Sequence, residues 1–399
     1  MTSKSVAIIG AGPAGCMCAY WALKNNINIT LFDFAPPLNT LLYTGGGRCN
    51  LAYAEYDFKE LAKNYPRGQK FLYSIFSRFS TSDTINFFET IGVKTFTQED
   101  SRVFPMSQSA SKVKAAMLLA LSECSFKREK VLNIEKNEVF CITTDKNKYK
   151  FDKVVISVGG HSGFSLAKDS GHKIIAPKPA LTGLITKENF KQIQGVSLKN
   201  IKAEISCLER KFQPQQNDMI FTHEGISGPL AYKISSICAR EDYSREKPLS
   251  IKLNFLAGNE IFCFTPNSTG VFQDILNTNS KKDIKNLLAE FIPKSLSEYI
   301  LQQNKIMLNT KCCEINGKTR DSILKSLIEF EINVVSTAKE GEVVTSGGVC
   351  LDEINPKTME SKLIEGLYFC GEVIDVDGFC GGFNLQNCWS TGFVAGNSI

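Results

Sequence analysis

The chain of 399 residues contains only three histidines, and they are widely scattered. His161, His172 and His223 are too few and too far apart to suggest a metal cage or a recognisable Ser-His-Asp site. The 14 cysteines show no CxxC spacing and no zinc-finger spacing. We therefore expect no metal site, and we interpret the cysteines as reduced, mostly buried thiols of a cytoplasmic protein.

Long apolar runs and concentrated positive charge are also missing. No run of about 18 apolar residues is present, so we expect no membrane span, and glycine and proline interrupt the first apolar run, so we expect no signal peptide. The net charge of +5 is mild, and no stretch combines Lys and Arg with aromatic residues in a basic stripe. We therefore expect no nucleic-acid partner. With 43% hydrophobic and 22% charged residues, the chain is globular and long enough for two or three domains.

What the sequence does contain is a phosphate-binding turn in a full β-α-β context. The apolar run from Ser5 to Ile9 is followed by the GxGxxG pattern of Gly10 to Gly15, then by helical spacing and a second strand that ends on Asp33. The glycines allow a tight turn, close approach of a pyrophosphate, and packing of helix on strand. The helix N-terminus offers free N–H groups, and Asp33 can accept hydrogen bonds from a ribose diol.

Three further glycine-rich segments suit close approach of the backbone to a ligand. They are residues 44–50 (TGGGRCN), the turn at 159–160 that ends a buried strand over 151–158, and residues 371–386, in which Glu372 follows a strand and Asn384 begins the last helix. Asn384 could cap that helix, and we expect the first and last of these segments to converge.

The hydrophobic patterns divide the chain. A helix is predicted over 111–122, and strands are predicted over 130–134, 139–144 and 149–152. Short β-like runs dominate from about residue 183 to 265. Helical spacing then follows to about residue 330, where apolar residues recur at i, i+3, i+4 and i+7 between Ile284 and Phe291. Because the end of the chain returns to strand, glycine loop and helix, we expect a discontinuous α/β domain with two inserted pieces.

Together these motifs resemble the BaiN/RdsA family of FAD-dependent oxidoreductases, also labelled aminoacetone-oxidase-like. The resemblance covers essentially the whole chain and the order of its segments. The matching segments are TGGGRCN at 44–50, FPMS at 104–107, THEGISGP at 222–229, VTSGGV at 344–349, INPKTMESK at 354–362 and GLYFCGEVIDVDGFCGGFNLQ at 366–386.

The resemblance implies an α/β fold in which a Rossmann-type FAD-binding domain is interrupted by a small β-barrel and a helical cap. The expected domains are residues 1–182 and 343–399 for the two parts of the FAD-binding domain, 183–268 with a return strand at 330–342 for the barrel, and 269–329 for the helical insert. The insert is expected to form a wall of the substrate site.

The resemblance also implies FAD, held non-covalently, in the N-terminal site. Glu372 is expected near the ribityl and phosphate end, and the backbone of Val131 near the adenine. The last helix is expected to point its N-terminus at the flavin, which favours the reduced state. The expected cofactor-binding residues are Gly10, Ala11, Gly12, Pro13, Ala14, Gly15, Asp33, Gly46, Gly47, Arg48, Cys49, Asn50, Val131, Val158, Gly159, Gly371, Glu372, Gly382, Asn384, Leu385 and Gln386.

The expected function is that of an FAD-dependent oxidoreductase acting on a small molecule. No catalytic acid or base stands out. Cys49 has no CxxC partner, and a structural thiol is the better interpretation than a redox thiol. No second GxGxxG follows a strand, so the flavin is reduced either by transiently bound NAD(P)H or directly by an organic substrate. The alternatives are a flavin-dependent RNA-modifying protein and a non-catalytic flavin-binding or sensing module. The sequence does not specify the substrate or the oligomeric state.

Overall fold

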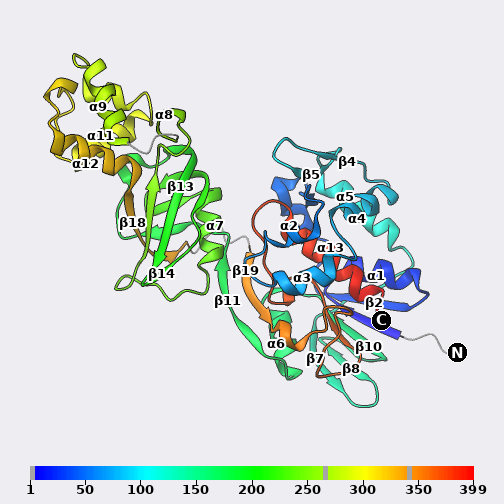
Figure 1. The fold of residues 1–399 in the computed structure, drawn as a ribbon. Coiled ribbons are helices and arrows are strands. Elements are labelled where there is room, and N and C mark those ends of the chain that lie inside the picture. The colour runs from blue at the N-terminus through cyan, green and yellow to red at the C-terminus, as the bar shows by residue number, and fades with distance from the viewer. Residues whose placement is uncertain (1–4, 264–267, 339–343) are drawn as a thin grey trace. The chain divides into compact units, whose positions relative to one another are not determined.

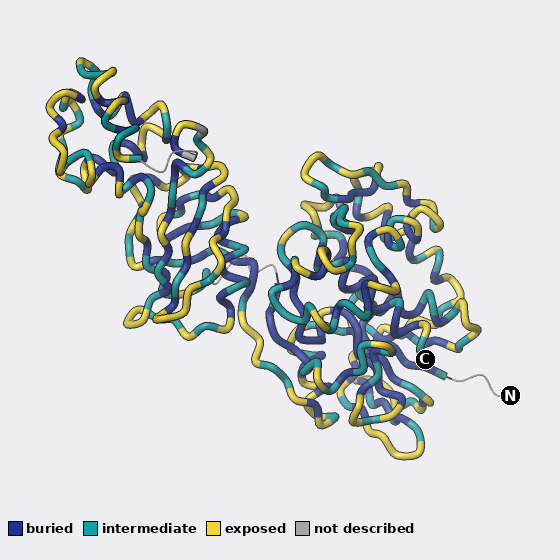
Figure 2. The backbone as a smooth tube through the Cα atoms, viewed as in Figure 1, coloured by how far each residue is buried: buried dark blue, intermediate teal, exposed yellow. Residues whose placement is uncertain are grey.

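The computed structural model describes residues 5–263, 268–338 and 344–399. The chain folds into two compact units (Figure 1). Unit 1 contains residues 1–178 and 345–399, and unit 2 contains residues 179–344. Each unit has its own buried core, which follows the central strands and helices (Figure 2).

Unit 1 is built on a five-stranded parallel sheet with the order β20-β10-β1-β2-β6. These strands are β1 (Ser5–Ile9), β2 (Asn28–Asp33), β6 (Ser125–Arg128), β10 (Lys153–Ile156) and β20 (Leu367–Phe369). The central strands are apolar and buried, as expected for a parallel sheet that is covered on both faces. The sequence did not indicate β6, because this edge strand is mostly exposed and has no hydrophobic pattern.

The first and last helices of unit 1 pack together (Figure 1). They are α1 (Pro13–Lys24) and α13 (Phe383–Gly396). A Cβ added to Gly392 would lie 2.5 Å from the carbonyl oxygen of Ala14, and one added to Gly396 would lie 2.5 Å from that of Cys18. Only glycine allows this close approach. The N-terminal and C-terminal segments of the chain therefore pack together within unit 1.

The other elements of unit 1 agree largely with the sequence-based expectations. The helix expected over 111–122 is α5 (Ala110–Ala120), and the three expected strands are β7 (Val131–Lys136), β8 (Phe140–Thr144) and β9 (Lys148–Phe151), which form an antiparallel sheet. The remaining elements are η1 (Thr40–Gly47), β3 (Ala52–Tyr53), α2 (Phe58–Ala62), α3 (Gln69–Phe76), α4 (Thr81–Thr90), β4 (Thr95–Thr97), β5 (Arg102–Pro105), α6 (Gly160–Asp169), β11 (Ile174–Ala180), β19 (Val344–Val349), η4 (Leu351–Glu353) and η5 (Gly371–Val373).

Unit 2 contains a closed six-stranded antiparallel barrel, as the resemblance implied. Its strands follow the order β13-β15-β16-β12-β18-β17, and β17 pairs back with β13. The strands are β12 (Leu184–Thr186), β13 (Ser197–Cys207), β15 (Gln215–Thr222), β16 (Gly225–Ser227), β17 (Leu249–Asn254) and β18 (Phe330–Thr337), with β14 (Arg210–Lys211) attached to β13. The expected return strand at 330–342 is thus seen as β18; residues 339–343 lie outside the described residues.

Helices complete unit 2 and share one apolar core with the barrel. They are η2 (Lys191–Ile193), α7 (Pro229–Ile237), α8 (Glu260–Cys263), α9 (Ser268–Thr278), α10 (Ile284–Leu288), α11 (Lys294–Gln303), η3 (Cys312–Glu314) and α12 (Gly317–Ile328). The helix expected to reach Phe291 ends earlier, at Leu288. Pro293 follows closely and occupies the N-cap position of α11, which explains the break.

Candidate functional site

The turn between β1 and α1 has an open N-terminal helix end. Gly12 is the N-cap residue of α1, Pro13 occupies the first turn, and no side chain caps the helix. A Cβ added to Gly12 would meet no protein atom within 4 Å, whereas one added to Gly10 would lie 2.5 Å from the backbone nitrogen of Val158. The turn is therefore packed on its inner side and open on its outer side, as a site for a phosphate requires.

Asp33 lies at the end of β2 and closes this turn. Its Oδ2 accepts a hydrogen bond of 2.8 Å from the backbone N–H of Ala11, and its Oδ1 accepts one of 2.9 Å from Ala35. Each carboxylate oxygen can accept a further bond, so Asp33 remains able to bind a hydroxyl. Asp33 lines a hollow together with Gly10, Val131 and Val158.

The same hollow contains a carboxylate that the sequence did not reveal. Glu129 is buried and accepts hydrogen bonds from Thr144 Oγ1 at 2.6 Å and from Tyr149 Oη at 2.9 Å. The bond from Thr144 is the main cause that lowers the pKa of Glu129. Glu129 lies in the connection between β6 and β7, where no motif marks it, so only the folded structure brings it beside Asp33.

The C-terminal part of unit 1 meets the N-terminal turn at Gly371 and Glu372. A Cβ on Gly371 would lie 2.5 Å from the Cβ of Ala14, and the Cβ of Glu372 lies 3.3 Å from the position that a Cβ on Gly159 would take. Glu372 is exposed, and the protein atoms around its carboxyl group limit hydration and raise its pKa. Three predicted segments therefore form one continuous surface.

A second group of predicted residues gathers at the start of α13. Gly382 is the N-cap residue, with a φ of 99°, and no side chain caps the helix. A Cβ on Gly382 would lie 2.7 Å from the carbonyl carbon of Ala52 and 2.9 Å from Oδ1 of Asn50. Trp389 Nε1 donates a hydrogen bond of 3.0 Å to the carbonyl oxygen of Leu51. The two glycine-rich segments from opposite ends of the chain thus meet.

Asn50 and Cys49 differ in what they offer to a ligand. Asn50 is buried, and its Oδ1 has no hydrogen-bond partner among the described residues. An unpaired buried acceptor beside an uncapped helix N-terminus fits a bound polar ring. Cys49 is fully buried with a φ of 66°, and its burial raises the pKa of its thiol to about 12.

The side chains of the last predicted residues point into the protein. Asn384 does not cap α13: its Nδ2 donates to the carbonyl oxygen of Gly378 at 2.9 Å, and its Oδ1 accepts from the N–H of Gly378 at 2.8 Å. The expected capping role was wrong, because Asn384 follows the N-cap by two residues and faces the preceding loop. Gln386 is buried and donates to Thr84 Oγ1 and Ser390 Oγ, both at 2.9 Å. Leu385 packs against the core.

The TGGGRCN segment forms the end of η1 and the residues that follow it. Space is open at Gly46, where an added Cβ would meet nothing within 4 Å, and largely open at Gly47. Arg48 donates from Nε to the carbonyl oxygen of Gly45 at 3.2 Å, and its guanidinium carbon lies 4.4 Å from the centre of the Phe104 ring. This stacking fixes Arg48 at the surface of the segment.

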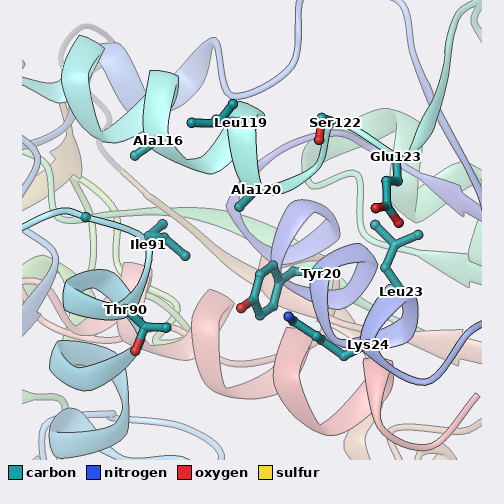
Figure 3. Close-up of a pocket in the computed structure, with 11 residues that line it drawn as sticks. Tyr20, Leu23, Lys24, Thr90, Ile91, Ala116, Leu119, Ala120, Ser122 and Glu123 are labelled. Atoms are coloured by element: carbon teal, nitrogen blue, oxygen red, sulfur yellow. The ribbon is translucent and has the colours of Figure 1, made fainter.

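A separate hollow of about 540 Å³ lies between α1, α5 and the residues that follow α4 (Figure 3). Tyr20 and Lys24 come from α1, and the exposed Leu119 comes from α5. None of the predicted cofactor residues lines it, and the polar groups around it are ordinary helix-end side chains. We assign no ligand to this hollow.

Two kinds of site find no support. Within residues 5–263, 268–338 and 344–399, no cluster of three or more His, Cys, Asp or Glu side chains is arranged to hold a metal ion. Of the described helices, none combines the length and the apolar character that crossing a membrane requires.

A parallel sheet with uncapped helix ends, interrupted by a β-barrel and a helical insert, defines the Rossmann-type flavoprotein class of oxidoreductases. The chain belongs to the HI0933-like family, since the family model described as "HI0933-like protein Rossmann domain" matches residues 4–398. It is therefore an FAD-dependent oxidoreductase.

Relatives of established name cover nearly the full chain. A 3-dehydro-bile acid delta(4,6)-reductase from Clostridium scindens is 27% identical and covers 98% of both chains. A ribosomal RNA dihydrouridine synthase from Haemophilus influenzae is 28% identical over 98% of this chain and 97% of the relative. The corresponding Escherichia coli protein is 26% identical over 98% of this chain and 97% of its own.

Solved structures share the fold. An open flavocytochrome c3 fumarate reductase has a TM-score of 0.50 at 16% identity, over 99% of this chain and 78% of its own. The 3-ketosteroid delta1-dehydrogenase from Sterolibacterium denitrificans has a TM-score of 0.50 at 11% identity, over 100% of this chain and 99% of its own. At such low identity these likenesses define the architecture alone.

Proposed function

We propose that this protein uses FAD to reduce a carbon–carbon double bond that is conjugated with a carbonyl group in a small organic substrate. The observation that carries the proposal is the full-length likeness to two differently named reductive enzymes. A 3-dehydro bile acid with delta(4,6) double bonds is a conjugated ketone. The uracil ring that becomes dihydrouridine also has its double bond conjugated with a carbonyl. Both names thus describe the same type of reaction, which is the reduction of a double bond conjugated with a carbonyl group.

The residues of unit 1 fit FAD without a covalent link. The uncapped turn at Gly10–Gly15 would bind the pyrophosphate through backbone N–H groups, and Asp33 would accept hydrogen bonds from the adenosine ribose. The backbone of Val131 would meet the adenine, while Val158, Gly159, Gly371 and Glu372 would border the ribityl chain. When bound, reduced FAD supplies the hydride for the reduction.

The start of α13 and the TGGGRCN segment would hold the flavin ring. Uncapped N–H groups and the positive end of the helix dipole stabilise negative charge. Asn50 would accept a hydrogen bond from an N–H group of the ring, which removes its unpaired state. Gly382, Asn384, Leu385 and Gln386 would contribute through their backbone, since their side chains, where present, are engaged elsewhere or packed.

We propose NAD(P)H as a transient electron donor. The N-terminal GxGxxG is the one full dinucleotide fingerprint in the sequence, and FAD occupies it in this proposal. A donor would therefore bind over the flavin without a dedicated Rossmann unit. A cytoplasmic location would supply this donor, and the free thiols of the described cysteines are compatible with a reducing compartment.

Ribosomal RNA is the second candidate substrate, because two relatives bear the name of a ribosomal RNA dihydrouridine synthase. RNA binding depends strongly on clustered positive charge. The net charge of this chain is only +5, and its sequence has no basic stripe, so we favour the small molecule. Both candidates need the same flavin site.

The test is anaerobic. The purified yellow protein should lose its flavin absorbance with NADH or NADPH, and the reduced protein should regain it when a 3-oxo-4-ene steroid is added. A saturated 3-oxosteroid is the matched control and should leave the protein reduced. Reoxidation by uridine-containing ribosomal RNA, with no response to the steroid, would transfer the proposal to the second candidate. A protein reoxidised by neither would overturn this assignment of the substrate class.

A further inference from the structure

One short segment of unit 1 encloses the loop that leads into α13. We call residues 64–68 (Asn64, Tyr65, Pro66, Arg67 and Gly68) the bracket, and residues 374–382 the glycine loop. The bracket lies between α2 and α3, more than 300 residues before the glycine loop in the sequence. No motif marks it, and its contacts arise only in the folded chain.

The central contact is a buried ion pair. Arg67 donates from Nε to Oδ1 of Asp377 at 2.6 Å and from Nη2 to Oδ2 of the same carboxylate. The side chain of Arg67 is 10% exposed and that of Asp377 is 0% exposed. This bidentate geometry fixes the orientation of the guanidinium group as well as its distance from the carboxylate. A buried ion pair contributes little net stability, so the charges that it holds beside α13 are the better explanation for its presence.

The other bracket residues hold the start of α13. Tyr65 is fully buried and donates from its hydroxyl to the carbonyl oxygen of Phe383, the first residue of the helix, at 2.6 Å. Its burial raises its pKa, so the hydroxyl keeps the proton that it donates. The N–H of Phe379 donates to the carbonyl oxygen of Asn64 at 3.0 Å. The loop is therefore held at its middle and at its end.

We propose that Arg67, held at the loop that leads into α13, supplies a positive charge beside the N-terminal end of this helix, so that reduction of FAD is favoured. This inference rests on the proposed function, which places the start of α13 at the flavin ring. Arg67 acts through its charge, and the bidentate bond to Asp377 holds that charge in place. Loss of this positive charge would leave more net negative charge beside the helix end, which opposes the negative charge of the reduced ring.

The charge argument predicts opposite effects for the two partners. Arg67→Met removes one positive charge from this place, so the affinity for reduced FAD relative to oxidised FAD should fall about threefold to tenfold. Asp377→Asn removes one negative charge from the same place, so the same ratio should rise. A loop that is merely loosened would lower the ratio in both variants, because the helix end would move away from the ring.

The experiment measures the FAD reduction potential of each purified holoprotein against a reference dye, together with the dissociation constant of oxidised FAD. Lys63→Met is the matched control, because Lys63 pairs with Glu60 on the neighbouring α2 in an exposed setting. We expect a wild-type potential for Lys63→Met, a lower one for Arg67→Met and a higher one for Asp377→Asn. Arg67→Lys keeps the cation and should lie close to wild type.

Shifts of the same sign in Arg67→Met and Asp377→Asn, or unchanged potentials in both, would overturn the inference while leaving the proposed function intact. A wild-type protein that binds no FAD would instead overturn the proposed function. If Arg67→Met does not fold, Asp377→Asn and Arg67→Lys decide the question: a lowered or unchanged potential for Asp377→Asn, with Arg67→Lys at wild type, contradicts the proposal.

Discussion

The two halves of the proposed FAD site are built in different ways. The turn at Gly10–Gly15 is local, because strand, glycines, helix and Asp33 follow one another in the sequence. The start of α13 is assembled from distant segments: Asn50, Tyr65 and Arg67 all contact residues near Gly382. A local site is recognisable from its sequence pattern. A site made by tertiary contacts shows only its glycines, and the residues that shape it stay hidden.

The largest effect is expected in the local half, where substitution of Gly15 should disturb both the folding of the turn and the binding of FAD. A Cβ in Gly15→Ala would lie 1.9 Å from the carbonyl oxygen of Gly10, so α1 must move away from the turn. We expect the free energy of unfolding of the apoprotein to fall by about 2–3 kcal/mol, measured by urea denaturation. FAD binding should be lost as well.

Gly12→Ala is the matched variant, since its Cβ would meet no protein atom within 4 Å. The apoprotein should lose less than about 1 kcal/mol of stability, while its affinity for FAD should fall about tenfold or more, because the methyl group occupies the phosphate's space. Wild-type affinity in a titration of the Gly12→Ala apoprotein would mean that no phosphate approaches this turn.

The next effect concerns Asp33, which also belongs to the local half. Asp33→Ala removes the proposed acceptor for the ribose hydroxyls and leaves the N–H groups of Ala11 and Ala35 without their partner. FAD binding should weaken by about 1–3 kcal/mol. FMN lacks the adenosine, so its affinity should change far less in the same titration. Equal losses for FAD and FMN would remove Asp33 from the ribose site and assign it to the shape of the turn alone.

A smaller effect is expected at Asn384, in the assembled half. Asn384→Ala removes both hydrogen bonds to Gly378 and should lower the free energy of unfolding by about 1 kcal/mol. Asn384→Asp tests the bond that the amide group donates to Gly378. Aspartate is a good N-cap, but it cannot donate to the carbonyl oxygen of Gly378. We expect the Asp variant to be less stable than wild type in thermal unfolding. A gain in stability would show that the bond donated to Gly378 does not stabilise the protein.

The same contrast explains how much the sequence predicted. The fold class and the elements around the first glycine turn follow from patterns that need only neighbouring residues, such as apolar strands and GxGxxG spacing. The closed barrel came from the family resemblance, because short alternating strands do not reveal their pairing order. Edge strand β6 was missed because exposed edge residues have no pattern. Phe291 was placed in a helix because apolar spacing alone does not register the break before Pro293.

Within the site, the errors and omissions have a common physical cause. Asn384 looks like a cap in sequence because it stands at a helix start, yet its side chain bonds backward to Gly378. Glu129 and Arg67 were missed because each acquires its partners from residues distant in the chain. Burial of a polar group depends on tertiary structure, and a single sequence does not contain it explicitly.

The smallest expected effect concerns Cys49, for which the lack of a CxxC partner and the burial of the side chain both indicate a structural thiol. Because burial raises the pKa of Cys49 to about 12, roughly one thiol in ten thousand is ionised at pH 8, and the thiolate is the reactive form. Iodoacetamide at this pH should therefore label the exposed Cys313 first and leave Cys49 unmodified until urea unfolds the protein. Peptide mass mapping over time measures both rates in one sample.

Cys49→Ser is the companion variant and should retain FAD with nearly unchanged affinity and reduction potential, since the side chain is held away from solvent. In the wild-type protein, the rate at which Cys49 is labelled should rise with pH only as the pH approaches the raised pKa of its thiol. Cys49 would be a reactive thiol if it were labelled in the native protein as fast as Cys313. The same conclusion would follow if Cys49→Ser bound FAD but were no longer reduced by NAD(P)H. The assembled half of the site would then contain a redox group.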